Sequence, residues 1–220
     1  MSCTLLPGEP NQERVFEWEQ YNARTRDREP EQTLLRALRS FEKSTRAAPL
    51  KAVDLGAGGG RDTRELLKRN WDVLAIDVTP RSLQEITASA KAFPGRLQTM
   101  VASFQSMKLQ ANTADLVNAS YSLPFVPKNQ FPAVWKKITA VMKDGGIFAG
   151  QFFGVQDEWN NNKDMTFFDI DEVKKLLEGF EVGYLAEVHS IEPGGGAPRK
   201  HWHYFNVVTR KLKELPHGNS

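Results

Sequence analysis

The feature that most constrains this chain is an apolar strand pattern that runs into closely spaced glycines and then into a helix pattern. Residues 53–67 read VDLGAGGGRDTRELL. The turn contains four glycines: Gly56, Gly58, Gly59 and Gly60. Glycine is required where the backbone adopts a positive φ or approaches a ligand closely, and the start of a helix presents bare N–H groups. The stretch therefore predicts a strand–turn–helix unit that binds a polar ligand.

A second acid follows at a distance typical of nucleotide-binding folds. The strand pattern WDVLAID ends in Asp77, about 20 residues after the first glycine, where an acid can bind ribose hydroxyls. A dinucleotide fingerprint, G-x-G-x-x-G, needs a third small residue. Counted from Gly56 that position holds Arg61, and counted from Gly58 it holds Thr63. The fingerprint fails, which argues against a nicotinamide-dependent oxidoreductase, the rival class of enzyme.

Residues 54–60 form an acid-x-G-x-G-x-G run that resembles the first motif of the class I S-adenosylmethionine-dependent methyltransferases. The later segments NASYSLPF (118–125), KDGGIFAGQFFG (143–154) and KHWHYFNVV (200–208) follow in the expected order. The residues of these segments are most similar to those of small-molecule methyltransferases of the tellurite-resistance and thiopurine groups. The resemblance covers residues 30–212 and implies S-adenosyl-L-methionine as the cofactor.

The resemblance also implies which residues bind that cofactor. The glycine turn would hold its methionine and ribose parts, Asp77 would accept both ribose hydroxyls, and Val78 would flank the adenine. The family usually places an acid near Ser103, and serine here weakens that contact but can still accept a hydrogen bond. This departure leaves open a non-catalytic, S-adenosylmethionine-binding regulatory domain. The predicted cofactor-binding residues are Asp54, Gly56, Ala57, Gly58, Gly60, Arg61, Asp77, Val78, Ser103, Phe104, Asn118, Ala119 and Ser120.

Aromatic side chains flank the expected opening of the site. The predicted substrate-pocket residues are Trp18, Tyr21, Tyr121, Phe125, Phe153 and Trp159, with packing in the core as the alternative for each. Such a pocket favours a small, partly apolar acceptor with a sulfur, nitrogen, oxygen or chalcogen nucleophile. The candidate general bases are His201 and His203, which point to one face of the last strand because they are two residues apart. The competing interpretation is a pair of packed or surface histidines, and no metal site is expected, because no Cys, Asp or Glu cluster accompanies them.

Strand and helix patterns alternate along the chain and predict an α/β fold. We expect a doubly wound, seven-stranded Rossmann-like sheet, mostly parallel, that ends in an antiparallel hairpin. The expected strands are 51–55, 72–76, 97–102, 114–119, 146–153, 181–190 and 201–209. The expected divisions are an N-terminal lid or helical segment (1–29), a class I methyltransferase domain (30–212) and a flexible tail (213–220).

The composition restricts the classes of binding partner and the cellular compartment that we expect. The formal net charge of +2 over 220 residues is too small to indicate a nucleic-acid or membrane surface. The single cysteine, Cys3, allows no internal disulfide and favours a reducing compartment. The start of the sequence lacks a secretory signal pattern. We therefore expect a cytoplasmic protein, monomeric or homodimeric, whose partner is a small-molecule methyl acceptor.

Overall fold

The protein is built around one mixed sheet. The computed structural model describes residues 12–42, 49–194 and 197–213. Seven strands follow the order β3-β2-β1-β4-β5-β8-β7, and a two-residue strand, β6, pairs with β5 outside this path. The bounds are β1 Lys51–Leu55, β2 Asp72–Asp77, β3 Arg96–Val101, β4 Ala114–Ala119, β5 Met142–Gly154, β6 Phe167–Phe168, β7 Phe180–Gly194 and β8 Ala197–Lys211. Strands β1 to β5 pair in parallel, whereas β8 is antiparallel to both β5 and β7. The predicted doubly wound sheet with a C-terminal antiparallel hairpin is confirmed.

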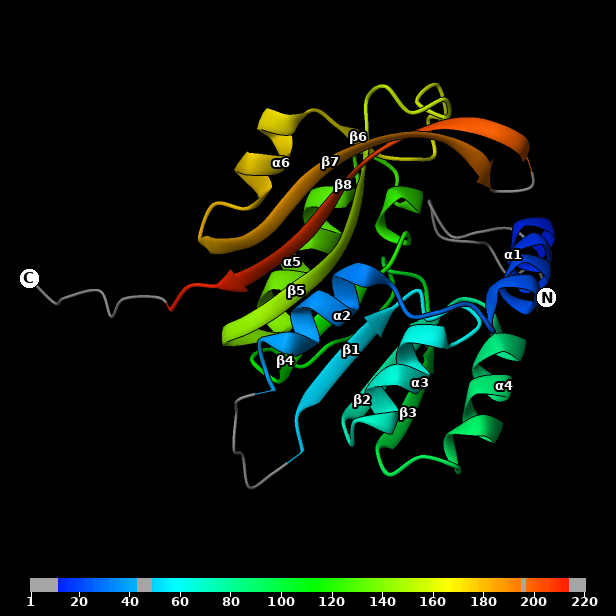
Figure 1. Ribbon diagram of the computed structural model, residues 1–220, viewed down its shortest axis with the longest axis vertical. Coiled ribbons are helices and arrows are strands. Elements are labelled where there is room, and N and C mark those ends of the chain that lie inside the picture. Colours follow the sequence, from blue (N-terminus) through cyan, green and yellow to red (C-terminus); the bar gives the residue numbers. More distant parts are fainter. Residues whose placement is uncertain (1–11, 43–48, 195–196, 214–220) are drawn as a thin grey trace, which may run out of the picture.

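Helices cover both faces of the sheet (Figure 1). Helices α2 and α3 pack with one face of the strands in one apolar cluster, and α5 and α6 pack on the opposite face in a larger one. Helix α4 contacts the edge strand β3 and its neighbour β2, and α1 contacts α4. The bounds are α1 Gln12–Thr25, α2 Gln32–Arg39, α3 Arg61–Lys68, α4 Pro80–Ala90, α5 Phe131–Val141 and α6 Ile170–Leu176, with a short 3₁₀ turn at Leu123–Phe125.

Burial along the strands explains why these sequences form a doubly covered sheet. All six residues of β4 are buried, and four of the five residues of β1 are buried. Strands covered on both faces need near-continuous apolar side chains, as these sequences have. Strand β3 lies at the sheet edge and is correspondingly more exposed. The central strands, whose carboxyl ends carry the predicted site, are therefore the best-buried part of the molecule.

Local residue patterns mark several helix ends. Asp169 and Glu172, with the three-residue spacing of a capping box, form one at α6. Asn70, a residue type that tolerates the left-handed conformation, adopts it after α3 with φ 61°. Thr79 is the N-cap residue of α4 and Pro80 its first residue, as the pair Thr-Pro indicates, and the Thr79 hydroxyl donates to Asp77. Pro30 favours a helix that starts there, but α2 begins at Gln32, so Pro30 lies outside its first turn.

Some predictions fall on parts of the chain outside the described residues. These parts include residues 1–11 of the expected N-terminal segment, most of the STRAAP linker and residues 214–220 of the expected tail. The division into a lid segment, a domain and a tail stays a prediction. Among the described helices, none combines the length and the apolar character that a membrane crossing requires.

Candidate functional site

The glycine turn between β1 and α3 directs its backbone donors into the protein. The N–H groups of Gly56 and Ala57 donate to the carbonyl oxygen of Ile76 at 2.8 Å and 3.0 Å, and that of Gly60 donates to Ala57 at 2.8 Å. Gly56, Gly58 and Gly60 all have positive φ, which explains the need for glycine. The expected bare N–H groups are therefore absent at these positions. A pyrophosphate cradle needs such donors, so the turn is poorly suited to a nicotinamide dinucleotide.

Asp77 closes the turn from the end of β2. Its Oδ2 accepts the N–H of Gly58 at 2.8 Å, and its Oδ1 accepts the N–H and the hydroxyl of Thr79 at 2.9 Å and 2.5 Å. A carboxylate has about four lone-pair positions. Three are occupied here, which leaves room for one ribose hydroxyl without rearrangement. Asp77 thus has the position expected of a ribose-binding acid and also a structural role that the sequence did not indicate.

Two further carboxyl groups meet beneath the turn. The side-chain amide of Asn118 donates to Asp54 Oδ1 at 2.9 Å and to Asp62 Oδ2 at 3.0 Å. Thr63 donates to Asp54 at 2.6 Å, and Ser120 donates to Asp62 at 2.6 Å. Burial, reinforced by the nearby carboxylate of Asp62, raises the pKa of Asp54 to about 7. The predicted Asp54, Asn118 and Ser120 are brought together, and Asp62 is a member that sequence reasoning missed.

Glu31 is a second missed residue at this site. Its backbone N–H donates to Asp62 Oδ1 at 2.9 Å, and its carboxylate forms an ion pair with the guanidinium of Arg61. Burial raises the pKa of Glu31, and the charge of Arg61 opposes this shift. Arg61 therefore lies beside the turn as predicted, but its charge is already balanced by a residue 30 positions earlier. No local pattern in the sequence pairs these two side chains.

The charges around the turn fit the expected cofactor better than a dinucleotide. Four carboxyl groups, those of Glu31, Asp54, Asp62 and Asp77, face two guanidinium groups, those of Arg61 and Arg64. The excess negative charge suits the sulfonium and the ammonium of S-adenosylmethionine. The same charge repels a pyrophosphate, whose two negative charges would lie on this turn in a dinucleotide complex.

The residues expected around the adenine form a looser group. An added Cβ at Gly56 would lie 3.5 Å from the Phe104 ring, so that ring packs close to the turn. The Ser103 hydroxyl is 2.8 Å from that of Ser106 and accepts the Ser106 N–H at 3.1 Å. Ser103 is thus engaged in its own loop. Of the remaining predicted residues, Ala57 and Ala119 are buried in the core, and Val78 is half-buried.

Helix α1 lies directly against the glycine turn. An added Cβ at Gly59 would lie 2.5 Å from the Arg26 Cβ and 2.7 Å from the Asn22 carbonyl oxygen. The Asn22 amide donates to Ser82 at 3.1 Å and to Thr79 at 3.3 Å. The end of α1 is thereby held to the start of α4. The N-terminal helix covers the turn, and Asn22 is the residue that fastens it.

An aromatic cluster lies where β4 and β5 end. Its aromatic members are Tyr121, Phe125, Phe153, Trp159, Phe167, Trp202 and Tyr204. The ring centroids of Tyr121 and Tyr204 are 5.4 Å apart, and Trp18 of α1 contacts Phe125 at 5.7 Å. Five of the six predicted pocket residues are thus brought together. Tyr21 is 40% exposed and is not a member of the cluster.

Tyr121 is the most unusual member of this cluster. Its φ of 53° is rare for a bulky residue and is typical of functional sites. Its backbone N–H donates to the buried Gln151 at 3.0 Å. Burial raises the pKa of the Tyr121 hydroxyl, and the Glu31 carboxylate and a hydrogen bond to Tyr204 act in the same direction. Through Tyr121 the aromatic cluster meets the carboxyl groups of the turn.

The two candidate bases lie on the other face of β8. Trp202 and Tyr204 face the aromatic cluster, whereas His203 contacts Phe205 on the opposite side. The Nδ1 of His203 accepts the N–H of Gln156 at 2.9 Å, so Nε2 carries the proton and donates to Glu187 at 2.9 Å. Burial lowers the pKa of His203. The assignment of the histidines as bases stays a prediction, and this arrangement does not favour it for His203.

One group of possible metal ligands exists among the described residues, formed by Glu187, His189 and His203. The rings of His189 and His203 stack at 4.2 Å with planes only 11° apart, so their lone pairs run parallel and do not converge on one point. A metal on Nε2 of His203 would also move its proton to Nδ1, against the N–H of Gln156. The stack is better explained as side-chain packing on the hairpin.

Comparisons with known proteins agree with this geometry. A family described as a methyltransferase domain matches residues 52–146, which include the glycine turn, Asp77 and β4. A comparison with curated protein sequences finds no match. The structure of TehB from Haemophilus influenzae superposes with a TM-score of 0.71 at 16% identity, over 89% of this chain and 67% of that chain.

Two further solved structures cover nearly the whole chain. A Burkholderia thailandensis 1,6-didemethyltoxoflavin-N1-methyltransferase, with bound 1,6-didemethyltoxoflavin and S-adenosylhomocysteine, gives a TM-score of 0.62 at 19% identity over 96% of this chain and 94% of that chain. A putative methyltransferase of Haloferax volcanii, in complex with the Trm112 activator, gives 0.67 at 15% identity over 94% of this chain and 99% of that chain. At such identities the likeness establishes the fold.

Proposed function

We propose that this chain is a class I methyltransferase that uses S-adenosylmethionine and methylates a small molecule bound at the aromatic cluster. The observation that carries the proposal is the junction at Tyr121. The Glu31 carboxylate acts on its hydroxyl, the preceding residue Ser120 donates to Asp62, and the rings of Phe153 and Tyr204 pack against its ring. A cofactor at the turn and an acceptor at the rings would therefore be neighbours.

The residues of the turn would bind and orient the cofactor. The Asp77 carboxylate would accept a ribose hydroxyl, and Asp54 and Asp62 would supply the negative charge that an ammonium group requires. When bound, S-adenosylmethionine supplies an electrophilic methyl group on a positively charged sulfur. The carboxyl groups of Asp54 and Asp62 are held by Asn118, Thr63 and Ser120, which limits their movement toward that sulfur. Such restraint favours transfer, because an anion pressed against the sulfonium stabilises the ground state.

The aromatic cluster would position the acceptor. Its rings supply flat apolar walls, and the Tyr121 hydroxyl, with its raised pKa, stays protonated and can donate a hydrogen bond. Positioning alone contributes several kcal/mol in reactions of this kind. A thiolate or a reduced chalcogen needs no protein base, whereas a protonated amine does. Since His203 has no free lone pair toward the cluster, the site favours acceptors that are already nucleophilic.

One of the similar structures supports a small-molecule acceptor in general, since it is a 1,6-didemethyltoxoflavin-N1-methyltransferase with that small molecule bound. A cytoplasmic location and a monomeric or homodimeric state stay predictions. The alternative function is a regulatory domain that binds S-adenosylmethionine without transferring its methyl group. The Ser103 hydroxyl favours this alternative, because it is already hydrogen-bonded within its own loop.

Labelled S-adenosylmethionine and a panel of thiols, phenols, amines and chalcogen anions test the proposal. We expect methyl transfer to at least one thiol or chalcogen anion, and loss of that transfer in Tyr121→Ala. Calorimetry with S-adenosylmethionine and with NADH provides the control for the cofactor. Cofactor binding without transfer to any acceptor would support the regulatory domain, and tight NADH binding without S-adenosylmethionine binding would support the oxidoreductase.

A further inference from the structure

Lys200, near the start of the described part of β8, has a buried ammonium group that the proposed chemistry does not use. The residue is 1% exposed, and its Nζ forms an ion pair with Asp157, which is 3% exposed. Lysine is almost never fully buried unless it is paired, since removal of a charge from water is costly. Burial lowers the pKa of Lys200, and the Asp157 carboxylate opposes that shift. A pair held at this cost is expected to have a specific role.

The ammonium group lies against the rings of the aromatic cluster. Its Nζ is 4.2 Å from the ring centroid of Trp159, 4.1 Å from that of Trp202 and 5.8 Å from that of Phe153. These distances are within the range of cation–π attraction, which is strongest for tryptophan and increases when the cation is desolvated. Lys200 therefore holds the indole of Trp159 from within the protein.

Asp157 holds the backbone around the same tryptophan. Its Oδ1 accepts the N–H of Trp159 at 2.9 Å, and its Oδ2 accepts the N–H of His203 at 3.1 Å. The neighbouring Glu158 donates its backbone N–H to the His201 carbonyl at 3.1 Å and accepts the His201 N–H at 2.9 Å. The segment 155–166 between β5 and β6 is thus fastened to β8 at this ion pair.

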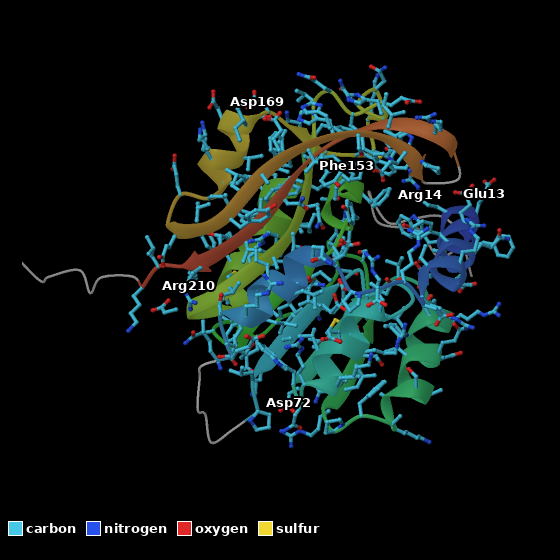
Figure 2. All side chains as sticks on the ribbon, viewed as in Figure 1. Glu13, Arg14, Asp72, Phe153, Asp169 and Arg210 are labelled. Carbon is cyan, nitrogen blue, oxygen red and sulfur yellow. The ribbon has the colours of Figure 1, made fainter. Side chains whose placement is uncertain are left out.

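This segment also meets the helix that covers the glycine turn. A guanidinium nitrogen of Arg14, on α1, lies 4.0 Å from the Asp164 carboxylate. Figure 2 shows Arg14 and Phe153 near the same end of the sheet, far from Asp72 at the start of β2. Segment 155–166 and α1 therefore adjoin each other above the carboxyl ends of the strands, where ligands of such folds bind.

We propose that Lys200 is a positioning residue for the methyl acceptor: with Asp157 it fixes Trp159 as a wall of the acceptor site. The proposal rests on the proposed function, because it takes the aromatic cluster to be that site. Loss of the pair would free the indole and the segment that carries it. The KM of the acceptor would then rise, whereas cofactor binding at the turn would not change.

The test removes both charges together, so that neither is left buried alone. In Lys200→Met/Asp157→Asn we expect an acceptor KM at least about tenfold higher, with kcat and the Kd of S-adenosylmethionine within about twofold. The acceptor is the compound from the panel that the unmodified chain methylates fastest. Lys200→Arg, which keeps the cation, is expected to stay near the unmodified KM. An unchanged KM in a folded double variant would overturn the proposal.

The matched control is Lys143→Met/Asp115→Asn, which removes both charges of another lysine–aspartate pair. Lys143 lies 3.0 Å from Asp115, at the start of β5 and far along that strand from Phe153. We expect no change in the KM of the acceptor for this variant. A rise in the acceptor KM of this control equal to that in Lys200→Met/Asp157→Asn would attribute the effect to general destabilisation. If the double variant does not fold, Asp157→Asn alone serves in the same assay.

Hydrogen exchange gives a second readout that needs no acceptor. In the double variant we expect the amides of 155–166 to exchange at least about tenfold faster, while those of 56–60 are unchanged. If the unmodified chain methylates nothing in the panel, the proposed function fails, but the exchange rates still decide the positioning role. Full protection of 155–166 in the double variant would overturn that role.

Discussion

Asp77 accepts a hydrogen bond from the backbone N–H of Gly58 at 2.8 Å, so the carboxylate at the end of β2 holds the middle of the glycine turn. The two residues are 19 positions apart, and parallel pairing of β1 with β2 brings them together. The same carboxylate is the expected acceptor for the ribose. One side chain therefore shapes the turn, and we expect the same side chain to bind the ligand.

Substitution of Asp77 is expected to affect both roles. Asp77→Ala should weaken binding of S-adenosylmethionine by more than about 1 kcal/mol, because a charged hydrogen-bond acceptor is lost. It should also lower the free energy of unfolding, since the donors of Gly58 and Thr79 lose their partner. Calorimetry and thermal unfolding measure the two effects. Asp72→Ala, at the opposite end of the same strand, where the carboxylate pairs with Arg96, is the control for affinity. Unchanged affinity in Asp77→Ala would remove Asp77 from the site.

Local patterns in the sequence were enough to predict the turn and the sheet. The glycines between β1 and α3, and the acid at the end of β2, depend on backbone conformation and strand order, which spacing and hydrophobic periodicity reveal. Glu31 and Asn22 were missed for the opposite reason. Glu31 meets Arg61 and Asn22 meets Ser82 only after distant segments have packed, and neither belongs to a recognisable motif.

On the last strand, the spacing of the residues predicts which side chains share a face, but not which face meets the site. The two-residue period correctly placed His201 and His203 on one face of β8, with Trp202 and Tyr204 on the other. Which face meets the end of β4 depends on the register of β8 with β5, where Phe153 pairs with Tyr204. A single sequence does not contain that register. The aromatic residues were therefore identified as a group, whereas the role of the histidines was not.

The buried Asp54 makes the stability of the unliganded protein depend on pH. Its pKa rises from 3.8 when exposed to about 7 in the folded protein. Between these values the folded state binds more protons than the unfolded state, so the free energy of unfolding falls as the pH rises from 4 to 7. A tenfold change in proton affinity corresponds to about 1.4 kcal/mol, so the total effect is a few kcal/mol at most. Denaturant unfolding at several pH values measures it.

The control for this dependence is Asp54→Asn, which cannot titrate. We expect its free energy of unfolding to fall less between pH 4 and 7 than that of the unmodified protein. Equal slopes for the two proteins would show that another group causes the dependence.

Binding of S-adenosylmethionine is expected to release a proton near neutral pH. The ammonium of its methionine part would favour the ionised form of Asp54, whose pKa is about 7 in the unliganded protein. Affinity should therefore increase as the pH rises toward 7 and then level off. Calorimetry in two buffers with different enthalpies of ionisation counts the released protons. Asp54→Asn should release fewer, and equal release would place the titrating group elsewhere.

Gly59 tests the contact between α1 and the turn. Gly59→Ala would place a Cβ 2.5 Å from that of Arg26 and 2.7 Å from the Asn22 carbonyl, so α1 must move away. We expect faster hydrogen exchange in residues 12–25 and about tenfold faster dissociation of S-adenosylmethionine. Gly183→Ala is the matched control, because its Cβ would meet nothing closer than 3.4 Å. The same exchange in both variants would show that α1 is not held by the turn.

Substitution of His203 distinguishes a structural histidine from a general base. In His203→Asn the side-chain oxygen can still accept the N–H of Gln156, while the bond to Glu187 is lost. We expect kcat to change by less than about twofold, whereas removal of a general base costs roughly 10²–10⁴-fold. A loss of that size, with a normal fold, would restore His203 as the base.

The pH dependence of unfolding provides an independent measure of the same residue. Because burial lowers the pKa of His203 below 6.5, the unfolded chain takes up a proton that the folded chain resists. The contribution of His203 to stability is therefore complete above that value and is lost as the pH falls through it, opposite in sign to the contribution of Asp54. His203→Asn should lose less stability than the unmodified protein between pH 6.5 and the onset of acid unfolding. Since Asp54→Asn should change the slope in the other direction, the two variants together identify which buried group titrates.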